Sequence, residues 1–337
     1  ISIRSVDLLD LPSLHRLRSQ VLAFDTVQQL TRGNPLRARA FLDYLDPARG
    51  IYTALMEERG HIMLAGQITH AGNRRSSNLS FITPSRGLTS KELPTLLEHL
   101  AEQAGDWGTF HMLAEADEHS HCFDILRSSG FSVYAWQRIW KYHPGSPLSA
   151  ENSNSAEWQP ASERDQISVR GLCQSLVPAF VQPIEHVFDK KVDGWICRDD
   201  CNLIGYADVI YGREGTWVQP YIHPEAQHVP AILKSLLSRI ETRGTKGVYI
   251  CVRSYQAWIE SVLEELPVLA SPRQALMVKH LAIVQKALKP ILAAAIEKSP
   301  GSATVARADT TKRMQEFMTQ RRITDELNIL LDVLPSK

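Results

Sequence analysis

The chain of 337 residues repeats itself, and this repeat limits the fold more than any other feature. Three motifs of the first half recur in the second half, in the same order and at an offset of about 140 residues. Chance similarity between apolar strands is the alternative explanation, and the shared order and spacing argue against it. The matching motifs are LAGQITH and LIGYADV (Gly66 and Gly205), FITPSRG and YIHPEAQ (Pro84 and Pro224), and RIWKY and LMVKH (Lys141 and Lys279).

The two copies begin at a larger offset, because Asp10 of ISIRSVDLLDLPSLHRL matches Asp165 of EWQPASERDQISVRGL. The first copy therefore carries additional residues, which we place in DTVQQLTRGNPLRARAF. Duplication followed by one insertion accounts for both offsets.

Both copies predict the same order of elements. A short strand leads into a helix, which Asp10 could cap in the first copy with Pro12 just inside it. Strands separated by hairpin turns, a helix, a strand, a second helix and a last strand follow. This order predicts the α/β class, as an α+β mixed sheet with helices packed on it. The clearest segments are 51–58, 61–71, 78–84, 91–104 and 109–116 in the first copy, and 194–199, 202–212, 216–222, 229–244 and 247–254 in the second.

A chain of this length is expected to form two domains of about 150 residues each. We predict a first domain at 1–143, a polar linker at 144–156, a second domain at 157–282 and a helical tail at 283–337. In the tail, KRMQEFMTQRRITDELNILLDVL places apolar residues at spacings of three and four. The stripe at 312–334 predicts a helix that packs on the domains or docks a protein partner.

The most specific motif is CFDILRSSGFSVYAWQRIWKY, at residues 122–142. Gly130 can adopt the left-handed conformation that ends a helix, and Phe131 is expected to enter the core as a strand begins. Strict alternation along this strand places Val133 and Ile139 on one face. The other face is expected to pack on the second copy or to stack on a ligand. It carries Tyr134, Trp136, Trp140 and Tyr142.

With this junction, the element order resembles the GNAT superfamily of acyl-CoA-dependent N-acyltransferases, over residues 1–142 and again over 157–282. The resemblance implies two tandem GNAT-like domains with a mixed sheet. It also implies acetyl-CoA or another acyl-CoA as co-substrate, and an amine of a small molecule or a protein as acceptor.

GNAT proteins bind the pyrophosphate of acyl-CoA at a loop of the form Arg/Gln-x-x-Gly-x-Gly/Ala before a helix, where backbone N–H groups hold the charge. The resemblance places this loop at 86–91. Arg86 fits, whereas Thr89 and Lys91 replace the glycines. Thr89 and Glu92 also predict a capping box, which would occupy the same N–H groups. The cofactor-binding candidates are Arg86, Gly87, Thr89, Ser90 and Lys91.

The second copy departs further from the loop pattern. Its loop, HPEAQHVPAI, has no glycine, and Glu225 and Pro230 both weaken an anion site. Many GNAT proteins also use a tyrosine as general acid, four residues before the glycine of the last helix. The resemblance places Leu126 and Leu263 at this position, and neither can donate a proton. Transfer by positioning alone remains open, because attack of a neutral amine on a bound thioester gains most from proximity.

A general base is expected on the central strands of a GNAT-like domain. The first copy offers no titratable group there, whereas the second offers Asp208, Tyr221 and His223. We therefore take these three as the catalytic candidates. The alternative interpretation is that Asp208 and His223 are solvated surface groups.

Charge and composition exclude several partner classes. Lysine plus arginine equals aspartate plus glutamate, at 37 each, so neither nucleic acid nor an anionic membrane is an expected partner. No apolar run approaches the roughly 20 residues of a membrane span, and no signal peptide is recognised. Five scattered cysteines fit a reducing compartment, which predicts a cytoplasmic location. No metal is expected, because the spacing matches no strong zinc signature among Cys197, Cys201, His186, His223 and His228.

Two functions remain open at this level. The first is an acyl-CoA-dependent N-acetyltransferase in which one copy keeps activity. The arginine loop favours the first copy, and the acid–base residues favour the second. The alternative is a catalytically degenerate GNAT-fold pseudoenzyme that acts as a binding or scaffold subunit.

Overall fold

A computed structural model describes residues 1–36, 50–70, 75–143, 145, 157–185, 192–199, 202–241 and 247–281. All of these residues belong to one compact unit, Ile1–Ile283. The predicted tail helix at 312–334 lies outside the described residues, as does most of the predicted linker, and its docking to a protein partner stays a prediction.

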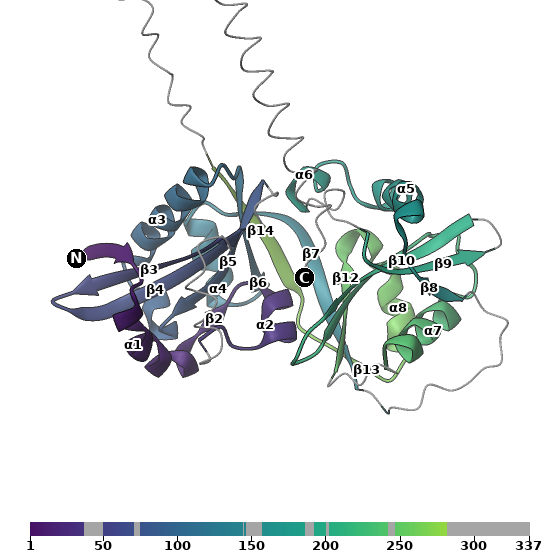
Figure 1. The fold of residues 1–337 in the computed structure, drawn as a ribbon, viewed down its shortest axis with the longest axis horizontal. Coiled ribbons are helices and arrows are strands. Elements are labelled where there is room, and N and C mark those ends of the chain that lie inside the picture. Colours follow the sequence, from purple (N-terminus) through teal and green to yellow (C-terminus); the bar gives the residue numbers. More distant parts are fainter. Residues whose placement is uncertain are drawn as a thin grey trace, which may run out of the picture. The chain divides into compact units, whose positions relative to one another are not determined.

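The two copies have the same order of strands and helices except for two short strands, Leu22–Ala23 in the first and Val268–Ala270 in the second, and short 3-10 turns (η) lie between the elements (Figure 1). The first copy consists of β1 (Ser2–Ser5), η1 (Leu8–Asp10), α1 (Leu11–Arg16), η2 (Arg18–Gln20), β2 (Leu22–Ala23), α2 (Thr26–Arg32), β3 (Ile51–Glu58), β4 (His61–His70), β5 (Ser76–Thr83), η5 (Ser85–Thr89), α3 (Leu93–Asp106), β6 (His111–Asp117), α4 (His121–Ser128) and β7 (Ser132–Tyr142). The second consists of β8 (Trp158–Pro160), η6 (Glu163–Asp165), α5 (Gln166–Leu176), α6 (Gln182–Glu185), β9 (Gly194–Asp199), β10 (Asn202–Tyr211), β11 (Thr216–Ile222), α7 (Val229–Glu241), β12 (Val248–Arg253), η7 (Ser254–Gln256), α8 (Trp258–Glu264), β13 (Val268–Ala270) and β14 (Gln274–His280).

The copies share a single sheet, because each gives its last long strand to the other. The order is β1-β3-β4-β5-β6-β14-β7-β12-β11-β10-β9-β8, with β2 paired to β5 and β13 paired to β7 at the side. Strand β14 runs antiparallel to both β6 and β7, and β7 runs antiparallel to β12. Figure 1 shows β14 and β7 side by side where the copies meet. Neither copy therefore has a complete sheet of its own.

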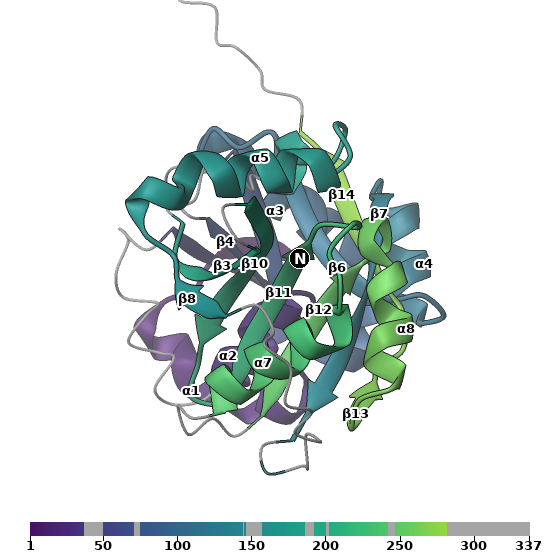
Figure 2. The same ribbon diagram turned by 90° about the vertical axis from the view of Figure 1, so that its right-hand side faces the viewer.

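Apolar cores cover both faces of the sheet in each copy. In the second copy, α7 and α8 pack on one face with Ala207 and Val218, while α5 packs on the other face with Tyr206 and Tyr221. Figure 2 shows α5 lying apart from α7 and α8. In the first copy, α3 and α4 contribute to one core, and Leu14 of α1 belongs to another. Alternate residues of β10 serve opposite faces, as the pleat of a strand requires.

The junction at Gly130 forms as the sequence predicts. Gly130 has φ +88°, and the N–H of Phe131 donates to the carbonyl of Leu126 at 3.0 Å, which ends the helix. Phe131 is buried in the core of the first copy. The Nζ of Lys279, on the exchanged strand β14, donates to the carbonyl of Ser129 at 3.0 Å. The second copy therefore helps to hold the helix end of the first.

The predicted strict alternation along β7 is wrong. The pairing of β7 with β14 shifts by one residue at Tyr134, so this residue and Trp136 lie in different cores. A one-residue irregularity of this kind moves a side chain to the opposite face of the sheet. Trp140 and Tyr142 are buried in the core of the second copy, as expected for packing between the copies. Tyr134 instead lines a cavity.

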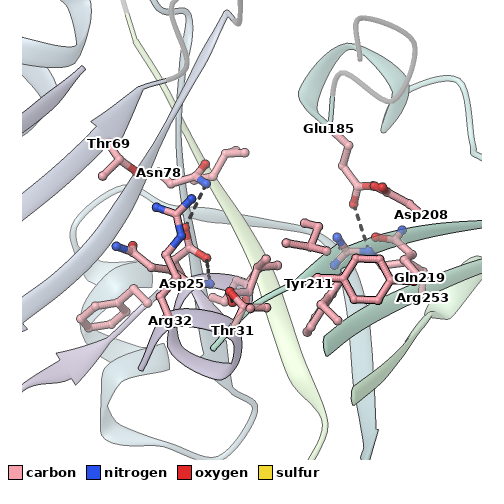
Figure 3. A pocket seen from close by; sticks show the side chains of 18 of the residues that line it. Asp25, Thr31, Arg32, Thr69, Asn78, Glu185, Asp208, Tyr211, Gln219 and Arg253 are labelled. Atoms are coloured by element: carbon pink, nitrogen blue, oxygen red, sulfur yellow. Dashed lines mark hydrogen bonds and ion pairs between the residues drawn. The ribbon is translucent and has the colours of Figure 1, made fainter. Parts of the chain in front are cut away.

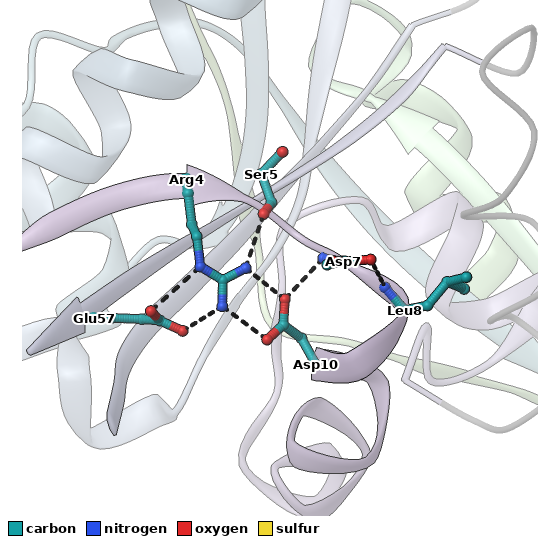
Figure 4. Close-up of polar contacts among 6 residues, drawn as sticks. All are labelled: Arg4, Ser5, Asp7, Leu8, Asp10 and Glu57. Atoms are coloured by element: carbon teal, nitrogen blue, oxygen red, sulfur yellow. Dashed lines mark hydrogen bonds and ion pairs between the residues drawn. The ribbon is translucent and has the colours of Figure 1, made fainter. Parts of the chain in front are cut away.

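Asp10 does not cap the first helix with its side chain, although it occupies the residue before α1. Its carboxylate accepts a hydrogen bond from the N–H of Asp7 and pairs with the guanidinium of Arg4, which also binds Glu57 on β3 (Figure 4). The corresponding Asp165 accepts from the N–H of Ser162. Aspartates at matching positions of the two copies thus stabilise the same turn, by accepting a hydrogen bond from the N–H three residues earlier.

We expect replacement of Asp10 by Asn to destabilise the protein at neutral pH by about 1 kcal/mol. The hydrogen bond with Arg4 lowers the pKa of the Asp10 carboxyl, so its stabilisation is present above the unfolded pKa and is lost as pH falls through the lower folded pKa. The free energies of unfolding of wild type and variant, measured in urea, should therefore differ at pH 7, and the difference should shrink as pH falls below about 4. A Glu58→Gln control alters an exposed carboxylate, and a constant difference for Asp10→Asn down to pH 2.5 would contradict the argument.

Candidate functional site

A cavity of about 1150 Å³ lies on one face of the shared sheet and is lined by both copies. Figure 3 shows Asp25, Asn78, Thr69 and Arg32 on one side of it, and residues of the second copy on the other. The second copy contributes Glu185, Asp208, Tyr211, Gln219 and Arg253 to the lining. The site is therefore composite, and an isolated copy would lack half of it.

Two gaps in the sheet border this cavity. Strand β5 is paired to β6 over Ser76 to Asn78, and β11 is paired to β12 over Thr216 to Val218. Beyond these short parallel ladders the strands of each pair separate. Such a gap presents backbone N–H and C=O groups that need partners, and an extended chain or ligand can supply them.

The chain itself fills the gap in the first copy. Strand β2 is antiparallel to β5, with Leu22 opposite Ile82 and Ala23 opposite Phe81. The next residue, Phe24, donates its N–H to the carbonyl of Ser80 at 2.9 Å, and its own carbonyl accepts from the N–H of Glu115 on β6 at 2.9 Å. A continuous stretch of main chain thus bridges β5 and β6.

A single side chain closes the gap in the second copy. Gln256 is 1% exposed. Its Nε2 donates to the carbonyl of Pro220 at 2.9 Å, and its Oε1 accepts from the N–H of Ile222 at 3.1 Å. The carboxamide therefore makes the two bonds that two successive amides of an extended ligand would make with β11. Side-chain torsions alone could release it, whereas opening the first gap requires movement of the main chain.

Opposite charges lie at matching positions beside the two gaps. Glu115 on β6 and Arg253 on β12 are separated by the same offset as Lys141 and Lys279. Gln137 of β7 joins them: its Nε2 donates to Glu115 Oε2 at 3.1 Å, and its Oε1 accepts from Arg253 Nη1. Arg253 also forms an ion pair with Glu185 of α6, with 3.5 Å between Nε and Oε1.

Burial sets the electrostatics of this group. It raises the pKa of the Glu115 carboxyl, and the nearby carboxylate of Asp25 raises this pKa further. The charge of Arg253 and the hydrogen bond from the N–H of Thr26 act in the opposite direction. Burial likewise raises the pKa of Tyr134 well above its ordinary value.

The catalytic candidates do not all reach the cavity. Asp208 and Tyr221 line it, and the hydroxyl of Tyr221 accepts a hydrogen bond from Gln219 at 2.8 Å. Burial raises the pKa of Tyr221 well above its ordinary value, so its hydroxyl resists ionisation and is a poor general base. His223 lies past the end of β11 and is not among the lining residues; its Nδ1 accepts from the N–H of Glu225 at 3.3 Å.

The cofactor-binding candidates lie together in and after η5, and none of them lines the cavity. Gly87 packs closely against β4, because a Cβ at this position would come within 2.1 Å of Leu64 Cδ2. The predicted capping box of Thr89 and Glu92 is wrong: Thr89 belongs to η5, where its hydroxyl donates to the carbonyl of Arg86 at 3.2 Å. Ser90 instead contacts the Glu92 carboxylate, and α3 begins one residue later.

Several N–H groups in and beside both loops already have partners inside the chain. In the first loop, Gly87 donates to the carbonyl of Pro84 and Ser90 to that of Gly87, at 2.8 and 3.0 Å. In the second, Ala226 donates to the carbonyl of His223 and Ile232 to that of His228, at 2.9 and 3.1 Å. Binding of a pyrophosphate by these groups remains a prediction, and it would require the turns to open.

The two positions of the general acid are apolar and closed. Leu126 is 1% exposed and Leu263 is fully buried, each in the core of its own copy. Neither side chain can donate a proton.

Sequence reasoning missed Glu115, Glu185, Arg253 and Gln256, and it named Tyr134 only as one of four aromatic residues on a face expected to pack on the second copy or to stack on a ligand. One signal was available, since Glu115 and Arg253 are charged residues that follow apolar runs, MLA in HMLAEAD and VYICV in VYICVR, at the offset of the duplication. The others depend on which segments the fold brings together. Glu185 comes from α6, and Tyr134 reaches the cavity through the shift in β7.

The described residues contain no group of three side chains that could hold a metal ion. Cys197 is a buried free cysteine, while His186 and Cys201, two other residues considered for zinc, lie outside the described part. None of the described helices is long and apolar enough to span a bilayer.

Comparisons with known proteins identify the fold. No protein-family model matches the sequence, and no curated protein matches it. Among solved structures, a GCN5-related N-acetyltransferase from Sphaerobacter thermophilus is similar, with a TM-score of 0.55 and 12% identity over 83% of this chain and 95% of that one. A tandem GNAT protein from the clavulanic acid biosynthesis pathway gives a TM-score of 0.50 and 12% identity over 83% and 98% of the two chains. The chain therefore has the GNAT fold in two tandem copies.

Proposed function

We propose that the protein is an acyl-CoA-dependent N-acyltransferase in which the second copy binds the acyl-CoA and the shared cavity receives the amine. The observation that carries this assignment is the difference between the two gaps. Main chain from Leu22 to Phe24 fills the first gap, whereas the carboxamide of Gln256 alone closes the second.

An acyl-CoA suits the second gap because its pantetheine arm is extended and carries two amides. The C=O of one amide and the N–H of the other can replace Gln256, accepting from the N–H of Ile222 and donating to the carbonyl of Pro220, as a β-strand ligand does with two successive amides. This pairing would bring the thioester to the edge of the cavity. The expected affinity is modest, because the following loop has no glycine to receive the pyrophosphate.

In the reaction, the nitrogen of a neutral amine attacks the thioester carbonyl carbon. The C–N bond forms, the C–S bond breaks, and the amine proton passes to the departing thiolate through solvent or a cavity group. Asp208 lines the cavity within the second copy and is the candidate that can accept a proton from an incoming ammonium. Orientation in a shared cavity supplies much of the rate enhancement.

Calorimetric titration of acetyl-CoA tests the assignment. We expect one molecule bound per chain, with an affinity that Arg86→Ala changes by less than about twofold because Arg86 belongs to the other copy. Loss of binding in Arg86→Ala would instead place the site in the first copy. Absence of any binding heat would overturn the acyltransferase assignment.

A second candidate is a binding protein without catalysis, as the degenerate GNAT hypothesis predicts. Buried leucines at both general-acid positions and internally paired loop N–H groups favour it. Release of free thiol from acetyl-CoA in the presence of a panel of amines separates the two. Binding without thiol release supports the second candidate, and amine-dependent release supports the first.

A further inference from the structure

The cavity contains a buried pair of opposite charges whose hydrogen-bonding capacity is only partly used. Within the described part of the chain, Glu115 accepts two hydrogen bonds, from the N–H of Thr26 at 3.0 Å and from Gln137 at 3.1 Å, and both reach Oε2. Neither of these two bonds uses Oε1, at which a ligand donor could bind.

Arg253, the cation of the pair, likewise has N–H donors that its contacts do not use. Its side chain is 10% exposed, Nη1 donates to Gln137, and Nε faces Glu185 without a hydrogen bond. Neither contact involves Nη2. Guanidinium groups bind carboxylates through two parallel N–H donors, and an anionic ligand could complete that arrangement here.

Gln137 holds the two charges in fixed places. Its carboxamide has one orientation that satisfies both neighbours, with nitrogen toward Glu115 and oxygen toward Arg253. Gln274 of β14 reinforces this orientation by accepting from the same Nε2 at 2.9 Å. The floor of the cavity is therefore negative toward the first copy and positive toward the second.

The other charges around the cavity are of both signs. On the first-copy side, Asp25 adds a carboxylate close to Glu115. On the second-copy side, Glu185 partly balances Arg253, and Asp208 lies on β10. Three further arginines line the cavity and are exposed: Arg32, Arg170 and Arg213.

We propose that the cavity binds a small zwitterion of the amino acid or short peptide class, with its ammonium at Glu115 and Asp25 and its carboxylate at Arg253. Opposite charges on one ligand match the opposite charges on the cavity floor, and a volume of about 1150 Å³ accommodates more than a single amino acid. The proposal deepens the proposed function, because the same ligand would be the amine that is acylated. Its binding does not depend on acyl-CoA.

Thermal shift and calorimetry without acyl-CoA provide the test. The probes are the twenty free amino acids and a set of di- and tripeptides, each compared with its N-acetylated and its C-amidated form. We expect at least one unblocked compound to bind saturably, and both blocked forms to bind at least about tenfold more weakly, since each loses a charged hydrogen bond. Failure of every unblocked compound to bind would overturn the proposal, as would equal binding of the blocked forms.

Variants assign the two ends of the ligand. Glu115→Gln keeps an oxygen for Thr26 and Gln137 but removes the charge, so it should weaken the unblocked ligand and leave the N-acetylated form unchanged. The double variant Arg253→Gln with Glu185→Gln removes a buried ion pair without leaving a lone charge, and it should weaken binding of the unblocked ligand but not of the C-amidated form.

The matched control is Arg239→Gln, which removes the exposed ion pair with Glu157. If neither cavity variant changes binding more than this control, the ligand does not use Glu115 and Arg253. If no amino acid or peptide binds to the wild-type protein but acetyl-CoA does, the zwitterion proposal is refuted and the proposed acyl-CoA site is not.

Discussion

A fragment of residues 1–143, produced alone, is expected not to form a folded monomer. Its strand β7 takes all of its sheet partners, β12, β13 and β14, from the second copy, and β6 would lose β14. Trp140 and Tyr142 would lose the core in which they are buried. Each ring buries roughly 150–250 Å², which corresponds to several kcal/mol of hydrophobic stabilisation. The exposed strand edges would favour aggregation or exchange with a second fragment.

Co-expression with residues 157–281 should restore the structure as a one-to-one complex, because the two fragments together supply every strand of the sheet. Size-exclusion chromatography with light scattering measures the outcome. The intact chain, cleaved at a protease site introduced between residues 146 and 150, is the control and should remain associated. A monomeric first fragment that unfolds cooperatively would contradict the strand exchange.

The second large effect is expected from Gln256→Ala. This change removes the partners of the Ile222 N–H and the Pro220 carbonyl, and it should destabilise the free protein by about 2–4 kcal/mol. The same change should tighten acetyl-CoA binding, because the ligand no longer has to displace the carboxamide. Urea unfolding and calorimetry measure the two effects, which have opposite directions.

Glu118→Ala is the matched control, since Glu118 lies at the duplication offset from Gln256. Its carboxylate is 3.6 Å from Arg273 in a partly exposed ion pair, so its loss should cost less than about 1 kcal/mol and leave acetyl-CoA binding unchanged. Weaker acetyl-CoA binding in Gln256→Ala would mean that Gln256 contacts the ligand instead of closing its place. Unchanged binding would mean that acetyl-CoA does not use the second gap.

The fold could be predicted from the sequence because its determinants are local. Gly130 and Phe131 mark a helix end and a strand start through φ preference and apolarity, and the same order of motifs in both halves indicates a duplication. The failures are also local: Thr89 could cap a helix only if the helix began beside it, but a 3-10 turn takes that residue. Asp10 found a stronger partner in Arg4 than in the helix N–H groups.

The candidate site was only partly predictable. Asp208 and Tyr221 were found because they are polar residues on a central strand, and both line the cavity. Gln256 gave no signal, because a carboxamide after a strand is unremarkable until the backbone groups that it satisfies are known. Nor could sequence periodicity show that Leu22–Ala23 would pair with β5, since a two-residue strand has no pattern.

By itself, the sequence determined that this protein has two similar halves of mixed strands and helices, since spacing, turn residues and helix ends are encoded within short segments. The tertiary structure alone decided that the halves exchange their last strands, that each closes its own gap differently, and that Glu115 faces Arg253 across one cavity. These features depend on contacts between residues more than one hundred positions apart. Such contacts form where unpaired backbone groups of strand edges and buried charges can be hydrogen-bonded, because leaving them unpaired away from water costs free energy.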